Sequence, residues 1–221
     1  MVAQLSHALE QLRSVLRLSE EEAQAMLEAQ VLRETLKCPR CSAKKLYALK
    51  SERWRCSQCR YTFGLLAGRW VTSIRIPAKT WIVALKAFEA GLPAESMGQL
   101  TGLSRPTLYK VLNTIRLALA AQDPEALKRG NLLAAAKAGR YATVDLDANG
   151  GTNKEMSESF MKYVKIQASR HYSIPPKAFP LYFMEWELRF RRSGKPWFEE
   201  LLVAITRPEA FTETLPEPAA R

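Results

Sequence analysis

The sequence has no cysteine outside one short stretch and no long apolar run. All four cysteines fall between residues 37 and 63. Although 47% of the residues are hydrophobic, no unbroken apolar segment is long enough to span a bilayer. The N-terminus lacks the basic start, apolar core and small-residue cleavage site of a signal peptide. Since clustered cysteines also suit a reducing compartment, we expect a soluble, cytoplasmic protein without a membrane partner.

Acidic residues are scarce in one region of a strongly basic chain. The net charge is +11 and the pI is about 9.7. Residues 33–79 contain 12 Lys and Arg against 2 Asp and Glu, which accounts for nearly all of the excess. Such a region suggests contacts with phosphates, although a basic solvated surface without a partner is the simpler alternative. The chain shows no internal repeat and no phosphate-cradling glycine loop.

The cysteines form two Cys-x-x-Cys pairs, CPRC and CSQC. Each pair can present two thiolates on one tight turn, so the spacing predicts a tetrahedral structural zinc site with the ligands Cys38, Cys41, Cys56 and Cys59. Short β-prone segments at 46–49 and 54–55 predict the hairpin of a zinc ribbon. Four unrelated thiols or a disulfide pair is the alternative. Because four thiolates close the coordination sphere, we expect no chemistry at this metal.

Helices are expected on both sides of the ribbon. Residues 1–35 predict two amphipathic helices, the second opened by a capping box of Ser19 and Glu22. Their apolar stripes must pack either on the next domain or on another copy of the chain. Residues 63–76 are expected to form a strand or an extended linker. A further helix should run from Pro77 to a stop at Gly91.

The segment AESMGQLTGLSRPTLYKVLN, from Ala94, predicts a helix-turn-helix. Gly102 supplies the turn, Ser104 caps the second helix, and Gly98 lies where the two helices cross. An ordinary structural helix pair is the alternative. In the DNA-binding interpretation, the outer face of the second helix carries side chains able to reach phosphates and base edges, namely Arg105, Thr107, Tyr109, Lys110 and Asn113. Basic residues of the ribbon join this predicted interface: Lys44, Lys45, Arg55 and Arg60.

The remaining residues are expected to be helical apart from one strand, 141–146, which carries Asp145 and ends near Asp147. The predicted fold is mainly α with a small β part. The predicted divisions are an N-terminal helical segment (1–35), a zinc ribbon (36–76), a helix-turn-helix domain (77–138), a further domain (139–206) and a disordered tail (207–221).

The order of these features resembles the zinc-ribbon transposases of bacterial insertion sequences. The resemblance covers roughly residues 37–205. It is carried by CPRC and CSQC followed by YTF, by IPAKTW leading into TGLSRPTLYKVLNTIR, by VDLDANGG, and by ESF with HYSIPPKAF and ELRFRR. Each motif is weak alone, but their shared order is specific.

The resemblance implies a ribonuclease H-like catalytic domain in which three acidic residues hold two divalent ions. Asp145 matches the first carboxylate and Glu158 the last, while His171 matches a histidine of the family. Only residues 152–157 separate the two matched regions, so the middle Asp and most of the sheet have no counterpart. The chain thus resembles an internally deleted transposase, with magnesium expected only if it is catalytic. A solvated turn and helix end are the alternative reading of these acids.

We therefore expect a transposase-derived, nucleoid-associated protein that binds double-stranded DNA at a transposon end without cutting it. It could also form homo-oligomers. One alternative is an active transposase whose metal site is completed by another subunit. Another is a ribbon that docks RNA or a protein.

Overall fold

The computed structural model describes residues 2–125, 128, 154–170, 174–192 and 195–209. Two compact units are present: the first contains Met1–Ala118 and Trp197–Ala210, and the second contains Leu119–Pro196 and Phe211–Arg221. The described residues are mostly helical with one small sheet, which confirms the predicted fold class. None of the described helices combines the length and apolar character needed to cross a bilayer.

The secondary structure of the first unit follows the chain from the N-terminal helices through the ribbon to a helical core. Its elements are α1 (Val2–Arg17), α2 (Glu20–Leu32), β1 (Leu46–Ala48), β2 (Arg53–Cys56), β3 (Thr62–Gly64), the 3-10 helix η1 (Trp70–Thr72), α3 (Ala78–Glu89), α4 (Ala94–Thr101), most of α5 (Arg105–Ala120) and α9 (Phe198–Thr206). The described elements of the second unit are α7 (Lys154–Arg170), the 3-10 helix η2 (Pro176–Ala178) and α8 (Phe179–Arg192).

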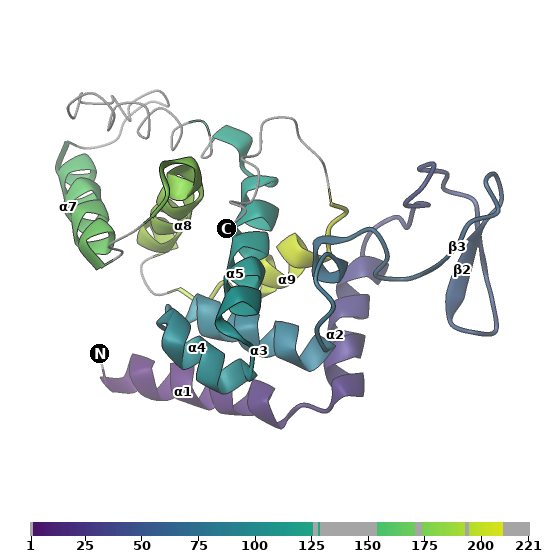
Figure 1. Cartoon of the computed structure of the whole chain (residues 1–221), viewed down its shortest axis with the longest axis horizontal. Helices are drawn as coiled ribbons and strands as arrows, with labels where there is room; N and C mark the ends of the chain where they lie inside the picture. Colours follow the sequence, from purple (N-terminus) through teal and green to yellow (C-terminus); the bar gives the residue numbers. More distant parts are fainter. Residues whose placement is uncertain (1, 126–127, 129–153, 171–173, 193–194, 210–221) are drawn as a thin grey trace. The chain divides into compact units, whose positions relative to one another are not determined.

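Helix α3 is the centre of the first unit. Its residues from Trp81 to Phe88 are all buried, and α1, α2, α4 and α9 pack against it (Figure 1). A helix that is apolar on nearly every side must be covered on every side. The sequence left open whether the N-terminal helices pack within the chain or on a second copy, and the structure packs them on α3.

Local sequence signals set the ends of these helices. The predicted capping box is present: the Glu22 amide donates to Ser19 Oγ at 3.1 Å, and the Ser19 amide donates to Glu22 Oε2 at 2.7 Å. The neighbouring Glu20 reaches another helix, since its carboxylate accepts the Ala78 amide at 2.5 Å and the Lys79 amide at 3.0 Å. One acidic turn therefore begins α2 and also satisfies the first amides of α3.

Helices α4 and α5 occupy the positions predicted for a helical pair. Gly102, at the end of α4, has a φ of 67°, and its amide donates to the Gly98 carbonyl at 2.9 Å. A left-handed residue at this point turns the chain sharply, which is why glycine is suited to it. A Cβ on Gly98 would lie 3.7 Å from Leu108 Cδ2, an ordinary contact. Gly98 thus faces the second helix as predicted, but alanine would also fit.

The ribbon sheet has the strand order β1-β2-β3, and both pairs are antiparallel. The predicted hairpin is β1 and β2, and the third strand, Thr62–Gly64, overlaps the start of the segment 63–76 that is predicted to be a strand or linker. After β3 this segment leaves the sheet. Gly68 has a φ of 72° and Trp70–Thr72 forms one 3-10 turn. Only the first residues of the segment 63–76 are therefore in a strand.

Helix α9 differs from the expectation most clearly. The predicted division places it at the end of the segment 139–206, whereas the structure packs α9 against α2 and α3 of the first unit. The physical reason is burial: Leu201, Leu202, Ala204 and Ile205 are each at most 1% exposed. Residues 207–209, which we assigned to the tail, also make backbone contacts with residues 68–70.

The described part of the second unit is a helical pair with an aromatic core. Helices α7 and α8 pack through a cluster of Phe160, Val164, Phe179, Phe183 and Trp186. Pro180 lies in the first turn of α8, where no amide is needed. The predicted strand 141–146 and the predicted helix through residue 138 lie outside the described residues, apart from the first residues of that helix.

Candidate functional site

Two backbone knuckles present the cysteine pairs, and they share one hydrogen-bond pattern. The Cys38 amide donates to the carbonyl five residues later, that of Ala43, at 2.9 Å. The Cys56 amide donates to the equivalent carbonyl, that of Tyr61, also at 2.9 Å. Each closed loop carries its second cysteine on the same side as its first.

Each knuckle is turned by a left-handed residue placed directly before the accepting carbonyl. Ser42 has a φ of 58° and Arg60 has a φ of 60°. Non-glycine residues adopt this conformation rarely because the Cβ approaches the backbone. The left-handed conformation occurs at the same position of both knuckles. The geometry of the knuckle, rather than the preference of the residue, therefore determines the backbone conformation of Ser42 and Arg60.

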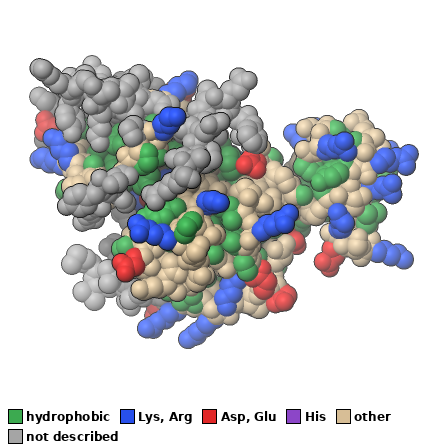
Figure 2. Space-filling model, viewed as in Figure 1, with side chains coloured by type: hydrophobic (Ala, Val, Ile, Leu, Met, Phe, Trp, Pro, Cys, Tyr) green, Lys and Arg blue, Asp and Glu red, His purple; other side chains and the backbone are tan. Residues whose placement is uncertain are grey.

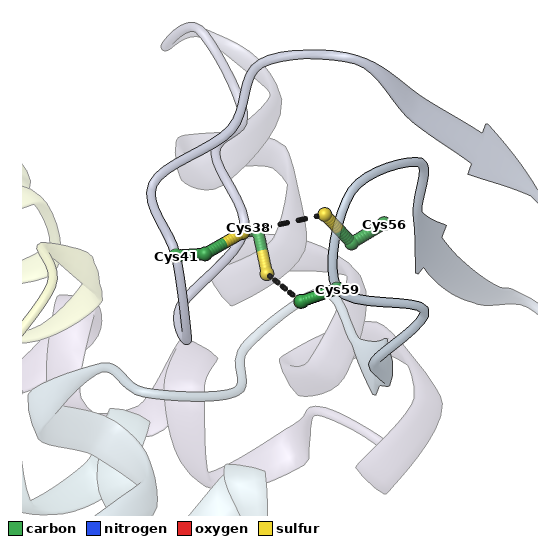
Figure 3. Close-up of side chains that lie close together, drawn as sticks. All are labelled: Cys38, Cys41, Cys56 and Cys59. Atoms are coloured by element: carbon green, nitrogen blue, oxygen red, sulfur yellow. Dashed lines mark hydrogen bonds between the residues drawn. The ribbon is translucent and has the colours of Figure 1, made fainter.

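The four sulfurs converge on one point (Figure 3). Cys38 Sγ lies 3.6 Å from Cys59 Sγ, Cys41 Sγ lies 3.5 Å from Cys56 Sγ, and all four sulfurs lie within 4.8 Å of one another. A tetrahedron with zinc–sulfur bonds of about 2.3 Å has sulfur–sulfur edges of about 3.8 Å. A disulfide would need a sulfur–sulfur distance of about 2.05 Å, so the alternative of a disulfide pair is excluded by these separations.

The electrostatics of the cluster favour a bound cation. Amide groups of Cys59 and Gln58 lower the pKa of Cys56 to about 6. The Ala43 amide acts in the same direction on Cys41, but the neighbouring thiols and desolvation outweigh it and raise the pKa of Cys41 to about 12. Four thiols at this spacing cannot all ionise against their mutual repulsion. A divalent ion that binds thiolates removes this obstacle, and the cysteines therefore form a structural zinc site.

The apolar core beside the zinc site is small. Only Cys38, Cys56 and Phe63 are buried in it, with Leu46 and Trp54 among the partly buried residues around them. Such a core does not hold a module of this size together without metal. The four thiolates leave no position for water, so the metal stabilises the fold and performs no chemistry.

A three-stranded sheet with two cysteine knuckles around one metal defines the class: this is a four-cysteine zinc ribbon. Comparison with known families adds that residues 18–62, a part of the 221-residue chain, match the family model described as the transposase zinc-ribbon domain. The ribbon segment is therefore similar to the zinc-ribbon domain of transposases, and this match supports a transposase-related zinc-binding protein. The match begins before α2 and ends at the first residue of β3, so the matched region contains α2, the four cysteines and the β1–β2 hairpin. No curated protein and no solved structure matches the chain.

The ribbon residues predicted to contact DNA are all exposed. Lys44 and Lys45 precede β1, Arg55 lies on β2, and Arg60 is the left-handed residue of the second knuckle. Lys and Arg side chains project from the ribbon in several directions, with few acidic neighbours (Figure 2). The structure thus gathers these four cations on one small module, and their contact with DNA stays a prediction.

The residues predicted to contact DNA from the second helix lie within the first nine residues of α5. Arg105, Tyr109 and Lys110 are exposed, and the Arg105 guanidinium carbon lies 5.7 Å from the centre of the Tyr109 ring. Thr107 and Asn113 are half-buried. The Thr107 hydroxyl lies 2.9 Å from the Ser104 hydroxyl, so it takes part in the start of the helix.

The predicted catalytic residues are not brought together by the part of the chain that the structure describes. Glu158 is exposed on α7, in the second unit. Asp145, Asp147 and His171 lie outside the described residues. The remnant catalytic site therefore stays a prediction.

Sequence reasoning missed the residues that join the ribbon to the helical core. Arg69 is buried, and its guanidinium donates to the Leu65 carbonyl at 3.3 Å and to the Thr206 carbonyl at the end of α9. Burial lowers the pKa of Arg69, against a smaller opposing effect of Glu34. A Cβ on the preceding residue, Gly68, would lie 2.8 Å from Pro39 Cβ in the first knuckle. A single arginine inside the apolar run FGLLAGRWV was the available signal, because arginine is buried only with partners.

Proposed function

We propose that this transposase-related zinc protein binds double-stranded DNA and does not cut it. We call residues 33–79 the basic region. The observation that carries the proposal is that nearly all Lys and Arg side chains of this region are exposed. Of its 12 Lys and Arg, Arg69 is buried and Lys79 half-buried, while the others are exposed. A cationic surface of this kind attracts phosphates by releasing condensed counterions from DNA. The ribbon would then supply affinity without much discrimination between sequences.

Sequence readout is assigned to α4 and α5 as a helix-turn-helix. Three features support this proposal: the left-handed turn at Gly102, the contact of Gly98 with the second helix, and the exposed Arg105, Tyr109 and Lys110 near the start of α5. In such motifs the first residues of the second helix reach base edges in the major groove. Arg105 and Lys110 would then contact guanine edges or phosphates.

The absence of cutting is proposed from the sequence. A two-metal site needs several carboxylates held a few ångströms apart by a rigid frame. Only six residues, 152–157, separate the matched strand segment from Glu158, which leaves no room for the strands that carry the middle Asp in the resembling family. The protein would therefore occupy a DNA end, as a repressor or a domesticated regulator does, without processing it.

A gel-shift titration tests the proposal. Labelled duplexes taken from both flanks of the coding region are mixed with the zinc-loaded full chain over a range of salt concentrations. The logarithm of the binding constant should fall linearly with the logarithm of the salt concentration, with a slope of about −0.9 for each neutralised phosphate. Absence of a shift at low salt would refute DNA binding.

Paired variants separate the two predicted surfaces. The double variant Arg105→Ala, Lys110→Ala should bind more weakly and lose preference between duplexes of different sequence. The variant Lys44→Ala, Lys45→Ala should weaken binding to all duplexes alike and make the salt slope less steep. Lys177→Ala, an exposed cation of the second unit, is the matched control and should bind like the wild type.

A further inference from the structure

The ribbon sheet has an inner and an outer face, and one aromatic side chain lies on the outer face. Residues Leu46, Trp54, Cys56 and Phe63 form the inner face and belong to the core beside the zinc site. Because side chains alternate along a strand, Tyr47 points to the opposite side. Tyr47 is 52% exposed, which is unusual for a large ring beside a core that has so few apolar side chains.

Strand register places cations directly beside this ring. Tyr47 of β1 is opposite Arg55 of β2, and Arg55 is opposite Thr62 of β3. Arg53, two residues before Arg55, lies on the same face and is also exposed. We define the outer ribbon face by these four residues: Tyr47, Arg53, Arg55 and Thr62.

The outer ribbon face is open rather than covered. Arg53 is opposite Gly64, and a Cβ on Gly64 would meet no atom within 4 Å. The Arg53 guanidinium donates to the Thr62 carbonyl at 3.2 Å, which keeps its charge over the sheet. The outer ribbon face is therefore an open surface that presents one exposed aromatic ring and two guanidinium groups.

We propose that the outer ribbon face binds an unpaired DNA strand, with one base stacked on Tyr47 and with Arg53 and Arg55 on its phosphates. This inference rests on the proposed function, since the strand belongs to the DNA that the protein holds. Stacking on an exposed aromatic ring beside cations is the general mode of single-strand binding, because every base has a π-face. The charge of the ribbon also suits the phosphates of a DNA strand, since the basic region contains 12 Lys and Arg against two acidic residues.

An unpaired strand explains the tyrosine better than a duplex does. In a duplex the faces of the bases are covered by their neighbours, and only the base edges are reachable in the grooves. Phosphate contacts alone would use Arg53 and Arg55 and leave the Tyr47 ring without a partner. The exposed Tyr47 ring, on the same sheet face as the two arginines, can stack against a base that is unpaired and unstacked from its neighbours.

A pair of probes distinguishes this inference from the proposed function. One probe is a blunt duplex of mixed sequence, and the other is the same duplex extended by an oligothymidine overhang. The zinc-loaded full chain should bind the overhang probe about tenfold more tightly, in line with one stacked base. Tyr47→Leu should remove this gain and leave binding of the blunt duplex unchanged, whereas Tyr47→Phe should keep the gain.

The outcomes divide clearly. Equal affinity for both probes, with the blunt duplex still bound, overturns the inference and leaves the proposed function standing. No binding to either probe overturns both. Loss of the gain in Tyr47→Phe as well as Tyr47→Leu shows a hydroxyl–phosphate contact and refutes stacking. Tighter binding of an oligouridine overhang refutes the assignment to DNA.

Two further variants guard against misfolding. Tyr61→Leu removes an exposed tyrosine from the side of the sheet that carries Phe63, against which Tyr61 stacks at 5.9 Å. It should keep the overhang gain. Arg55→Gln should reduce the gain while the Tyr47 ring stays in place, and a full gain in that variant would count against the proposal. The zinc content of each variant, measured by metal analysis, reports whether its ribbon is folded.

Discussion

Glu89 fixes the start of α9 to the end of α3, and the substitution Glu89→Ala should release it. Glu89 Oε1 accepts the amides of Trp197 at 2.7 Å and Phe198 at 2.9 Å. Its other oxygen lies 2.5 Å from the Lys86 ammonium, and both side chains are only 9% exposed. One carboxylate therefore caps a helix that is distant in sequence and neutralises a buried cation.

The size of the effect follows from this burial. Removing one partner of a buried ion pair costs about 3–5 kcal/mol, because the other charge stays buried. Lys86 also lies 4.8 Å from the centre of the Phe198 ring, which offsets part of that cost. We therefore expect Glu89→Ala to lower the free energy of unfolding of the first unit by about 3 kcal/mol. Glu89→Gln keeps an acceptor for the amides and should cost less, about 1–2 kcal/mol.

The measurement is urea denaturation, monitored both by tryptophan fluorescence and by circular dichroism. Two probes are needed because the two units need not unfold in one step, and transitions that do not coincide would reveal this. Glu125→Ala is the control. Glu125 pairs with Lys128 at 2.6 Å, also three residues apart, but these side chains are 68% and 67% exposed. That pair should contribute at most about 1 kcal/mol. If Glu89→Ala is no more destabilising than Glu125→Ala, the anchoring role of Glu89 is wrong.

Three other predictions concern the zinc, the linker and catalysis. Replacing Cys56 and Cys59 with serine should abolish zinc binding and weaken the gel shift while most of the helical dichroism remains, because the ribbon depends on its metal; unchanged zinc content would contradict this. Arg69→Met should lower the free energy of unfolding by about 2 kcal/mol, since it leaves two buried carbonyls without a donor, and a change near zero in urea denaturation would oppose that reasoning. With magnesium present, we expect no nicking of labelled duplex; nicking that disappears in both Asp145→Ala and Glu158→Ala would establish an active enzyme instead.

The metal site was predictable because its information is local. Each Cys-x-x-Cys pair closes its own knuckle through a hydrogen bond that spans five residues, and the loop between the pairs is short enough to form a hairpin. The prediction of a structural zinc site from these four cysteines is confirmed. The helix starts at Ser19 and Pro77 and the turn at Gly102 were equally local, since each depends on one residue type at one position.

The packing of α9 was not predictable in the same way. Its apolar residues indicate that it must be buried, but they do not indicate against which surface. The choice depends on Glu89, on Arg69 and on the buried side of α2, which lie far from α9 in the chain. Contacts at such separations leave no periodic pattern in the sequence.

The sequence alone determined the zinc ligands, the position of the basic region and the succession of helices, because spacing, charge and capping act over a few residues. Only the tertiary structure decided that the C-terminal helix completes the N-terminal unit and that Tyr47 lies beside two arginines on an open sheet face. The reason is that burial and strand register depend on which surfaces meet, and a linear pattern specifies that a residue needs a partner without specifying which one.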